Sequence, residues 1–299
     1  MDAPRTLYRE DHELFRTTVR RFLERDYLPR QRHCPGTEAL DRELWLQAGR
    51  QGLLCVTLPA QYGGGGDFGH AAVITEEFAS IGVQDRALSL HSDIVAPCLA
   101  SLGTLEQKQR WLPGVCSGAV ILALAMAEAQ GDEGECRTYA SRDGDDFLIN
   151  GSTCAVGNGG DYDLLLLACL TEDADGDLGL SLIMVESDRP GICPAHLAKA
   201  IRPGAGVCRE GLEINLTDVR VPQTHLLGEA GRGEDYLHEA LQQQQLLTAI
   251  FAARQLEQLL DPVLAQDSGP GGPPWDPQDI RLTLASIKAR ALSLGHGNN

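Results

Sequence analysis

The stretch from Leu122 to Asp163 constrains the fold more than any other part of the sequence. Its expected elements are, in order, a strand over 119–127, a loop rich in Gly and acidic residues over 130–135, a strand over 137–142, a turn at Asp143-Gly144, a strand over 147–149 and the dipeptide Asn150-Gly151. Asn-Gly between apolar runs predicts a two-residue hairpin, because both turn positions accept a positive φ. The stretch therefore predicts a small antiparallel sheet that interrupts a helical chain.

Apolar residues spaced as on one helix face predict helices on both sides of this sheet. They cover 7–28, 43–52, 70–81, 87–102, 104–112, 234–260 and 277–294, and further strands are expected over 163–170, 180–186 and 211–216. Asp11 is a possible N-cap of the first helix, Thr104 and Gln107 form a capping box, and Pro113 is expected to end the helix that the box begins. Gly63–Gly66 lack the Lys and the flanking strand of a phosphate loop, so we interpret them as a turn.

These elements predict an α+β fold that is mainly α. We expect an N-terminal α-helical domain over 1–117, a central antiparallel β domain over 118–229 and a shortened C-terminal helical segment over 230–299. The apolar faces of the last two helices must be covered by something, and a second copy of the chain or a related partner would serve.

The composition excludes several classes of function. A formal charge of −17 disfavours binding to nucleic acid, and it disfavours an anionic membrane unless a local basic patch exists. Nine scattered Cys without a C-x-x-C pair indicate reduced thiols in a cytoplasm, and no His cluster has zinc spacing. The N-terminus lacks a signal sequence and no apolar run has transmembrane length, so we expect a cytoplasmic protein.

Three phrases in the central stretch resemble motifs of the acyl-CoA dehydrogenase family, and of its long-chain type most. They are Ala127-Glu128-Ala129 for T-E-P, Gly131-Asp132-Glu133 for G-S-D, and the run from Asn150-Gly151 to Gly159 for the strand that begins N-G. The resemblance extends over about residues 8–260. It implies an N-terminal helical domain, a central β domain and a C-terminal bundle that is truncated here.

The same resemblance implies that four flavin contacts have changed. Ala127 replaces a Thr whose hydroxyl touches the flavin ring, and Asp132 replaces a Ser that meets the pyrophosphate. Ala155 replaces the aromatic residue that stacks on the ring, and Gly157 replaces a Thr at the flavin edge. Asp132 would also set negative charge against phosphate. From these positions we expect no bound cofactor.

The resemblance also implies that the catalytic carboxylate is replaced. The family's Glu corresponds to Gln244, and an amide cannot act as a general base near neutral pH. The ionisable groups that the resemblance places near the cavity are His91, Asp93, Glu128, Asp132 and Glu133. Of these, His91, Glu128 and Asp132, together with Gln244, are our candidate catalytic residues. A His on an apolar helix is more often a core residue than a catalyst, and an acidic loop is more often a solvated turn.

Four interpretations remain open at the level of sequence. The chain is a flavin-free protein that binds a CoA- or carrier-bound acyl thioester and catalyses an elimination, hydration or cyclisation, or it is a non-catalytic subunit of a homo- or hetero-oligomer with a family member. Alternatively it is an FAD-dependent acyl-CoA dehydrogenase with a rebuilt site, or an inactive remnant. The first two are compatible with each other, and together they are the pseudoenzyme interpretation that we favour.

Overall fold

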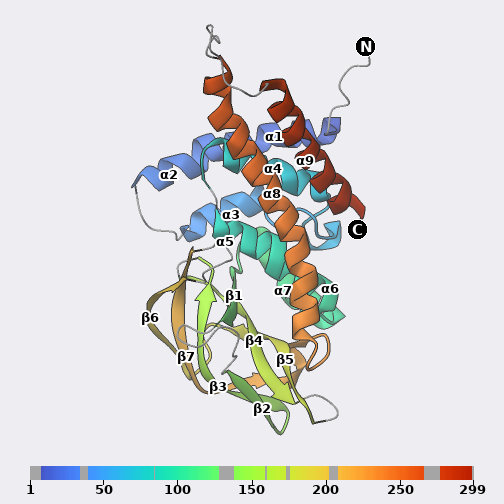
Figure 1. The fold of residues 1–299 in the computed structure, drawn as a ribbon. Helices are drawn as coiled ribbons and strands as arrows, with labels where there is room; N and C mark the ends of the chain where they lie inside the picture. The colour runs from blue at the N-terminus through green and yellow to red at the C-terminus, as the bar shows by residue number, and fades with distance from the viewer. Residues whose placement is uncertain are drawn as a thin grey trace.

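Helices form one half of the molecule and a β-sheet forms the other, with the long helix α8 reaching from the sheet through the helical half (Figure 1). The structure, a computed structural model, describes residues 8–33, 40–83, 85–127, 138–158, 160–172, 176–201, 208–265 and 277–297. This arrangement confirms the predicted α+β fold with helices before and after a central β region. The proposed domain limits stay predictions.

The described helices follow the apolar patterns of the sequence closely. Their bounds are α1 (Glu10–Phe22), α2 (Leu28–His33), α3 (Arg42–Arg50), α4 (Phe68–Ser80), α5 (Arg86–Ser89), α6 (Ala96–Leu102), α7 (Leu105–Ser117), α8 (Gly233–Ala265) and α9 (Pro277–Gly297), with π-helical segments η1 (Leu23–Tyr27) and η3 (Leu90–Val95) and 3-10 turns η2 (Ala60–Tyr62) and η4 (Gln223–His225).

Two predicted helix ends are wrong. The first helix is capped at Arg9, and Asp11 lies inside its first turn. The capping box of Thr104 and Gln107 is present, but α7 continues through Pro113 to Ser117. Pro113 and Gln109, whose carbonyl loses its helical donor, are both exposed, so water can replace the missing hydrogen bond.

The described strands form one mixed sheet in the order β6-β7-β3-β1-β4-β5-β8, with β2 pairing with β3 and β4. The bounds are β1 (Leu122–Ala127), β2 (Tyr139–Asp143), β3 (Asp146–Val156), β4 (Leu164–Glu172), β5 (Leu178–Glu186), β6 (Ile192–Ile201), β7 (Cys208–Pro222) and β8 (Leu226–Leu227). The expectation of a purely antiparallel sheet is wrong, because β4 runs parallel to β1 and to β2. Sequence patterns also missed β6.

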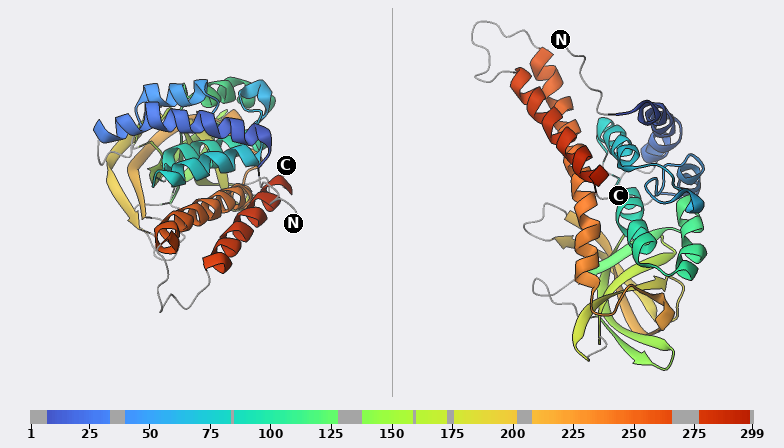
Figure 2. Two further views of the ribbon diagram at one scale, coloured as in Figure 1. Left: turned by 90° about the horizontal axis from the view of Figure 1, so that it is seen from above. Right: turned by 90° about the vertical axis from the view of Figure 1, so that its right-hand side faces the viewer.

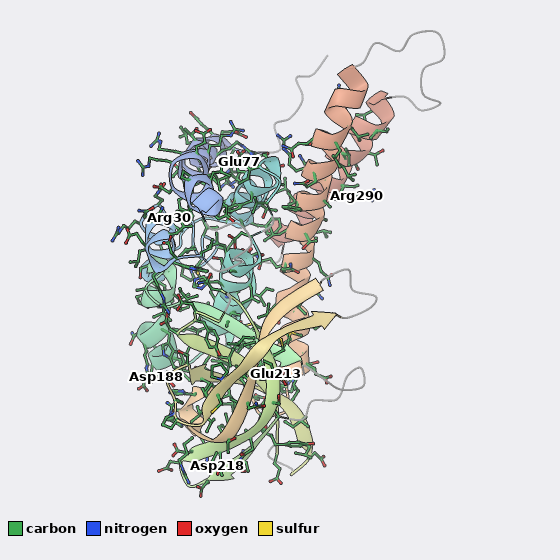
Figure 3. All side chains as sticks on the ribbon, turned by 90° about the vertical axis from the view of Figure 1, so that its left-hand side faces the viewer. Arg30, Glu77, Asp188, Glu213, Asp218 and Arg290 are labelled. Atoms are coloured by element: carbon green, nitrogen blue, oxygen red, sulfur yellow. The ribbon has the colours of Figure 1, made fainter. Side chains whose placement is uncertain are left out.

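The predicted hairpin at Asn150-Gly151 is also wrong. β3 runs straight through this dipeptide, and its pairing with β7 shifts register between Ile149 and Gly151. Asp218, which lies within the break on β7, has a φ of 51°. Its backbone N–H donates to Asn150 Oδ1 at 2.9 Å, while Asn150 Nδ2 donates to Asp218 Oδ1 at 3.1 Å. The dipeptide therefore lies opposite a β-bulge of β7, at the end of the sheet farthest from Arg290 of α9 (Figure 3).

One hydrophobic core connects the helical half to the sheet. It includes Leu99 and Leu112 from the helices and Leu122 and Leu165 from the strands, all fully buried. A second, smaller cluster lies under α9, where Ala291 and Leu292 pack with residues of α4 and α8. Figure 2 shows α9 alongside α8 on one side of the molecule. The inner face of α9 is thus covered by this chain itself, whereas Leu282, Ile287 and Leu294 remain exposed.

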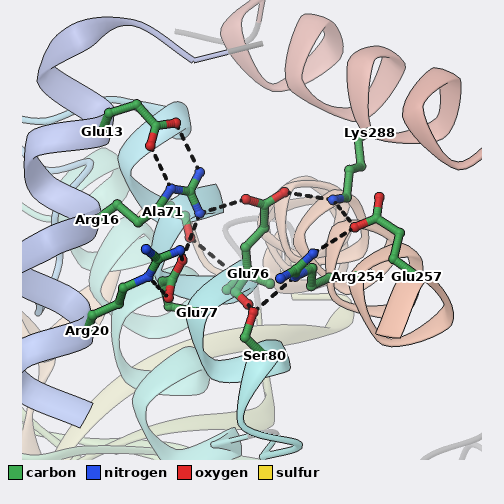
Figure 4. A network of polar contacts seen from close by, with 11 residues as sticks. Glu13, Arg16, Arg20, Ala71, Glu76, Glu77, Ser80, Arg254, Glu257 and Lys288 are labelled. Carbon is green, nitrogen blue, oxygen red and sulfur yellow. Dashed lines mark hydrogen bonds and ion pairs between the residues drawn. The ribbon is translucent and has the colours of Figure 1, made fainter. Parts of the chain in front are cut away.

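Buried charges fix α9 in place (Figure 4). Lys288 Nζ lies 3.1 Å from Glu76 Oε1 of α4 and 2.8 Å from Glu257 Oε2 of α8. Arg16 of α1 pairs with the other oxygen of Glu76 at 2.9 Å, and also with Glu77 at 2.9 Å. The early helices α1 and α4 and the last two helices, α8 and α9, are therefore joined by one network of ion pairs.

Candidate functional site

The candidate site is built around the π-helical segment η3, which lies between α5 and α6 and packs against α8 and β1. A π-helical turn widens the backbone spiral locally, and such turns are frequent at functional sites. Two residues that the sequence analysis singled out, His91 and Asp93, lie on this segment.

His91 is fully buried, with both ring nitrogens hydrogen-bonded. The backbone N–H of Leu122 donates to Nδ1 at 3.1 Å, and Nε2 is 3.2 Å from the carbonyl of Val115, to which it donates in the matching tautomer. Burial lowers the pKa of His91 to about 4, so the ring is neutral at physiological pH. Its geometry is that of a core residue that ties η3 to β1 and α7. A catalytic role for His91 stays a prediction.

Asp93 lies two residues further along η3 and is only partly exposed. Burial raises the pKa of its carboxyl to about 7, against an opposing hydrogen bond from the Ser89 side chain. A carboxyl group with a pKa near neutrality can both accept and donate a proton at physiological pH. Asp93 is therefore a described residue of the site whose chemistry suits proton transfer.

Gln244 lies on α8 and is half-buried. Its side-chain nitrogen donates to Thr248 Oγ1 at 3.1 Å, and that hydroxyl donates to the carbonyl of Gln244 at 3.0 Å. Both bonds stay within α8, one turn apart. They hold the amide along its own helix, and the amide offers no basic atom for abstraction of a proton.

The strand pair β1 and β3 is tightly packed where the flavin contacts were expected. Ala155 is buried and pairs with Ala125 of β1. A Cβ added to Gly157 would lie 2.9 Å from the Cβ of Ala123, closer than real side chains come. Ala127 is described only by its backbone, which pairs with Cys154. Glu128, Asp132 and Glu133 lie outside the described residues.

In the described part of the chain, one group could offer three ligand atoms to a metal ion: Asp11, His12 and His70, within 4.8 Å of one another. The oxygen Oδ1 of Asp67 already lies 2.9 Å from His12 Nε2 and 2.9 Å from His70 Nδ1, and Asp67 caps α4. Arg9 pairs with both carboxylates. Helix capping explains this arrangement, so we assign no metal to it.

The sequence analysis missed a pair of thiols beside this segment. Cys55 and Cys116 are both buried, and the backbone N–H of Cys55 donates to Ser92 Oγ of η3 at 3.1 Å. No spacing motif links residues so far apart in sequence.

Comparisons with known proteins agree with the fold. Residues 9–119 match the family model described as acyl-CoA dehydrogenase, N-terminal domain. Over 253 residues the chain is 36% identical to the long-chain specific acyl-CoA dehydrogenase, mitochondrial, of Rattus norvegicus, covering 83% of this chain and 58% of that protein. A crystal structure of acyl-CoA dehydrogenase from Geobacillus kaustophilus is 34% identical with a TM-score of 0.74, covering 96% of this chain and 77% of that one.

The chain belongs to the acyl-CoA dehydrogenase family. It spans about 58% of the length of the long-chain relatives that it matches. An acyl-CoA dehydrogenase from Bacillus anthracis, solved in complex with FAD, shares the fold with a TM-score of 0.73 at 24% identity, covering 97% of this chain and 50% of that one. No described helix of this family member is both long enough and apolar enough to cross a membrane.

Within this acyl-CoA dehydrogenase fold, two described residues at the expected flavin positions lack the side chains that the resemblance implies. Ala155 has no aromatic surface for stacking, and its side chain is buried. Gly157 has no hydroxyl, and a Cβ added there would lie 2.9 Å from the Cβ of Ala123. Neither residue can supply the side-chain contact that the resemblance implies.

Proposed function

We propose that this chain binds an acyl thioester, presented by CoA or by a carrier protein, and has lost the flavin-dependent redox reaction of its family. The observation that carries the proposal is Gln244. It stands where the family's catalytic Glu is expected, and its amide is hydrogen-bonded to Thr248 on the same helix. A dehydrogenase needs a carboxylate to remove the α-proton, and Gln cannot replace it.

The packing of β1 against β3 supports the loss of FAD. At Gly157 a Thr would have to displace Ala123 or the strand that carries it. At Ala155 the residue is small and buried between β1 and β7. At both positions, the residue that replaces the family's flavin contact therefore lies where the strands pack closely.

Asp93 supports non-redox chemistry as the remaining activity. Its raised pKa would let it move a proton in an elimination, hydration or cyclisation of the acyl group. The companion interpretation is a non-catalytic subunit that assembles with a second copy or with a family member. The exposed Leu282, Ile287 and Leu294 of α9 are available for such an assembly.

The alternative function is FAD-dependent α,β-desaturation of an acyl-CoA with a rebuilt site. The identity to the long-chain specific dehydrogenases favours this alternative, since their names state the activity. In that case the proton would go to a relocated base, and Asp93 is the described candidate.

An absorbance spectrum of the purified full chain tests the proposal directly. The protein is mixed with excess FAD, desalted and scanned for the flavin bands, and binding of a long-chain acyl-CoA is measured in parallel by calorimetry. We expect no flavin bands and measurable binding of the thioester. Retained flavin would support the alternative, and failure to bind any acyl thioester would contradict the proposed ligand.

The variant Gln244→Glu separates the two functions further. If FAD is truly lost, restoring the carboxylate alone gives no dehydrogenation of acyl-CoA. A gain of activity with added FAD would show that the flavin site had survived. A cytoplasmic location remains part of the proposal, and fractionation of the source cells would test it.

A further inference from the structure

The helical stretch from α5 to α6 widens at the π-helical segment η3. The backbone N–H of Ala96, which caps the segment, donates to the carbonyl of His91 five residues earlier, instead of four as in an α-helix. Pro97 follows in the first turn of α6 and has no N–H for the carbonyl of Asp93, four residues before it. Pro97 therefore disfavours a regular α-helix here, and the contacts of η3 decide between a kink and a wider turn.

The side chains of two consecutive residues hold η3 against three other segments. The N–H of Leu122, at the start of β1, donates to His91 Nδ1 at 3.1 Å, and His91 Nε2 donates to the carbonyl of Val115 in α7 at 3.2 Å. Ser92 Oγ accepts the N–H of Cys55, in the turn after α3, at 3.1 Å. Both side chains are less than a tenth exposed, so water has little access to these hydrogen bonds.

We propose that His91 and Ser92 are positioning residues, which hold η3 in its π-helical form and thereby fix the direction of the Asp93 carboxyl group. The inference rests on the proposed function, in which Asp93 moves a proton of the acyl thioester. His91 does not carry this proton itself, because protonation of Nδ1 would replace the acceptor of the Leu122 N–H by a second donor. Its effect on the reaction passes through the backbone of η3.

The closure of the π-helical turn determines where the Asp93 side chain lies. A turn closed over four residues instead of five would shift the helix by one residue, which corresponds to a rotation of about 100° and a translation of about 1.5 Å. Because η3 packs against α8 and β1, such a shift would move the carboxyl group relative to both. A displacement of about 1 Å from a productive geometry can lower a rate by about 100-fold.

Exchange of the α-protons of a long-chain acyl-CoA in D2O, catalysed by the full chain and followed by mass spectrometry, tests the proposal. The Asp93 carboxylate takes the α-proton, the electron pair of the C–H bond moves onto the thioester carbonyl, and a deuteron returns to the carbon. We expect exchange by the natural chain and none by Asp93→Asn. His91→Leu should lower kcat on the order of tenfold or more with little change in KM, since the thioester still binds.

Three further variants make the result specific. His91→Asn keeps an oxygen near the place of Nδ1 that can accept the Leu122 N–H, so it should recover much of the rate. Ser92→Ala is a smaller change that guards against loss of the fold, and it should lower kcat severalfold with KM unchanged. His225→Leu is the matched control, because His225 is also buried, with Nδ1 3.0 Å from the carbonyl of Met184, but lies outside η3. Its kcat should equal that of the natural chain.

A kcat for His91→Leu equal to that of His225→Leu would overturn the proposal. If the natural chain exchanges no α-proton, the proposed function of Asp93 fails, and thermal unfolding still decides the positioning. Asp93→Asn should then raise the Tm above pH 7 in the natural background and less in the His91→Leu and Ser92→Ala backgrounds, because a displaced carboxyl group reaches water. Equal changes of Tm in all three backgrounds would overturn the positioning role.

Discussion

The ammonium group of Lys288 lies 3.1 Å from the carboxylate of Glu76, with both side chains less than a tenth exposed. This ion pair joins the last described helix to α4 across most of the sequence. Because both charges have left water, their pairing is a condition for α9 to lie where it does. The contact explains how a helix with exposed leucines on its outer face remains docked through its inner one.

Replacing Lys288 should weaken the folded state. We expect Lys288→Met to lower the free energy of unfolding by about 2 kcal/mol, less than for a fully orphaned buried charge because Arg16 still neutralises Glu76. Urea denaturation measures the change. Arg290→Met on the exposed face of α9 is the matched control, expected to change stability by less than about 0.5 kcal/mol. Equal effects of the two variants would contradict a structural role for the buried pair.

His91 should make the fold sensitive to acid. Its pKa falls from 6.5 in the unfolded chain to about 4 in the folded one, so the unfolded state binds more protons between these values. The contribution of His91 is present above pH 6.5 and is lost as the pH falls through about 4. The shift corresponds to a loss on the order of 3 kcal/mol. The free energy of unfolding, measured by denaturation at several pH values in this range, should depend less on pH in His91→Gln. An unchanged slope of this free energy against pH would argue against the buried neutral ring.

Local signals in the sequence predicted elements whose partners lie nearby. The capping box of Thr104 and Gln107 is an example, since Thr104 N–H donates to Gln107 Oε1 at 2.7 Å and the reverse bond is 3.2 Å. The hairpin predicted at Asn150-Gly151 was wrong because the conformation of this dipeptide depends on Asp218, which lies on a strand much later in the chain. A dipeptide that favours a turn takes part in a bulge when both flanking strands continue.

The candidate site was predictable only in part. The resemblance directed attention to His91, Asp93 and Gln244, and the structure describes all three. It could not indicate that η3 is π-helical, or that the burial of Asp93 raises its pKa, because both depend on packing against α8 and β1. The burial of Cys55 and Cys116 beside η3 gave no signal at all, because it is a property of the tertiary fold.

Asp93 should change the stability of the fold with pH in the direction opposite to His91. Its pKa rises from 3.8 in the unfolded chain to about 7 in the folded one, so its contribution to stability is complete below 3.8 and is lost as the pH rises through about 7. Asp93→Asn should therefore be more stable than the natural chain above pH 7, by about 2 kcal/mol after allowance for partial solvent screening. The difference should vanish in acid. Thermal unfolding of the variant and of the natural chain, both above pH 7 and in acid, measures the difference in stability. A difference that is the same at both pH values would contradict a raised pKa.

The contact between Gly157 and Ala123 determines whether the flavin position can be restored by one substitution. Gly157→Thr supplies the hydroxyl that the family carries, but its Cβ would lie 2.9 Å from that of Ala123. We expect a loss of about 2 kcal/mol in stability, which Ala123→Gly should partly reverse in the double variant by removing the clashing methyl group. Urea denaturation of the two single variants and the double variant measures the coupling. Should Gly157→Thr be as stable as the natural chain, β1 and β3 would have room for the Thr, and the packing argument against FAD would be lost.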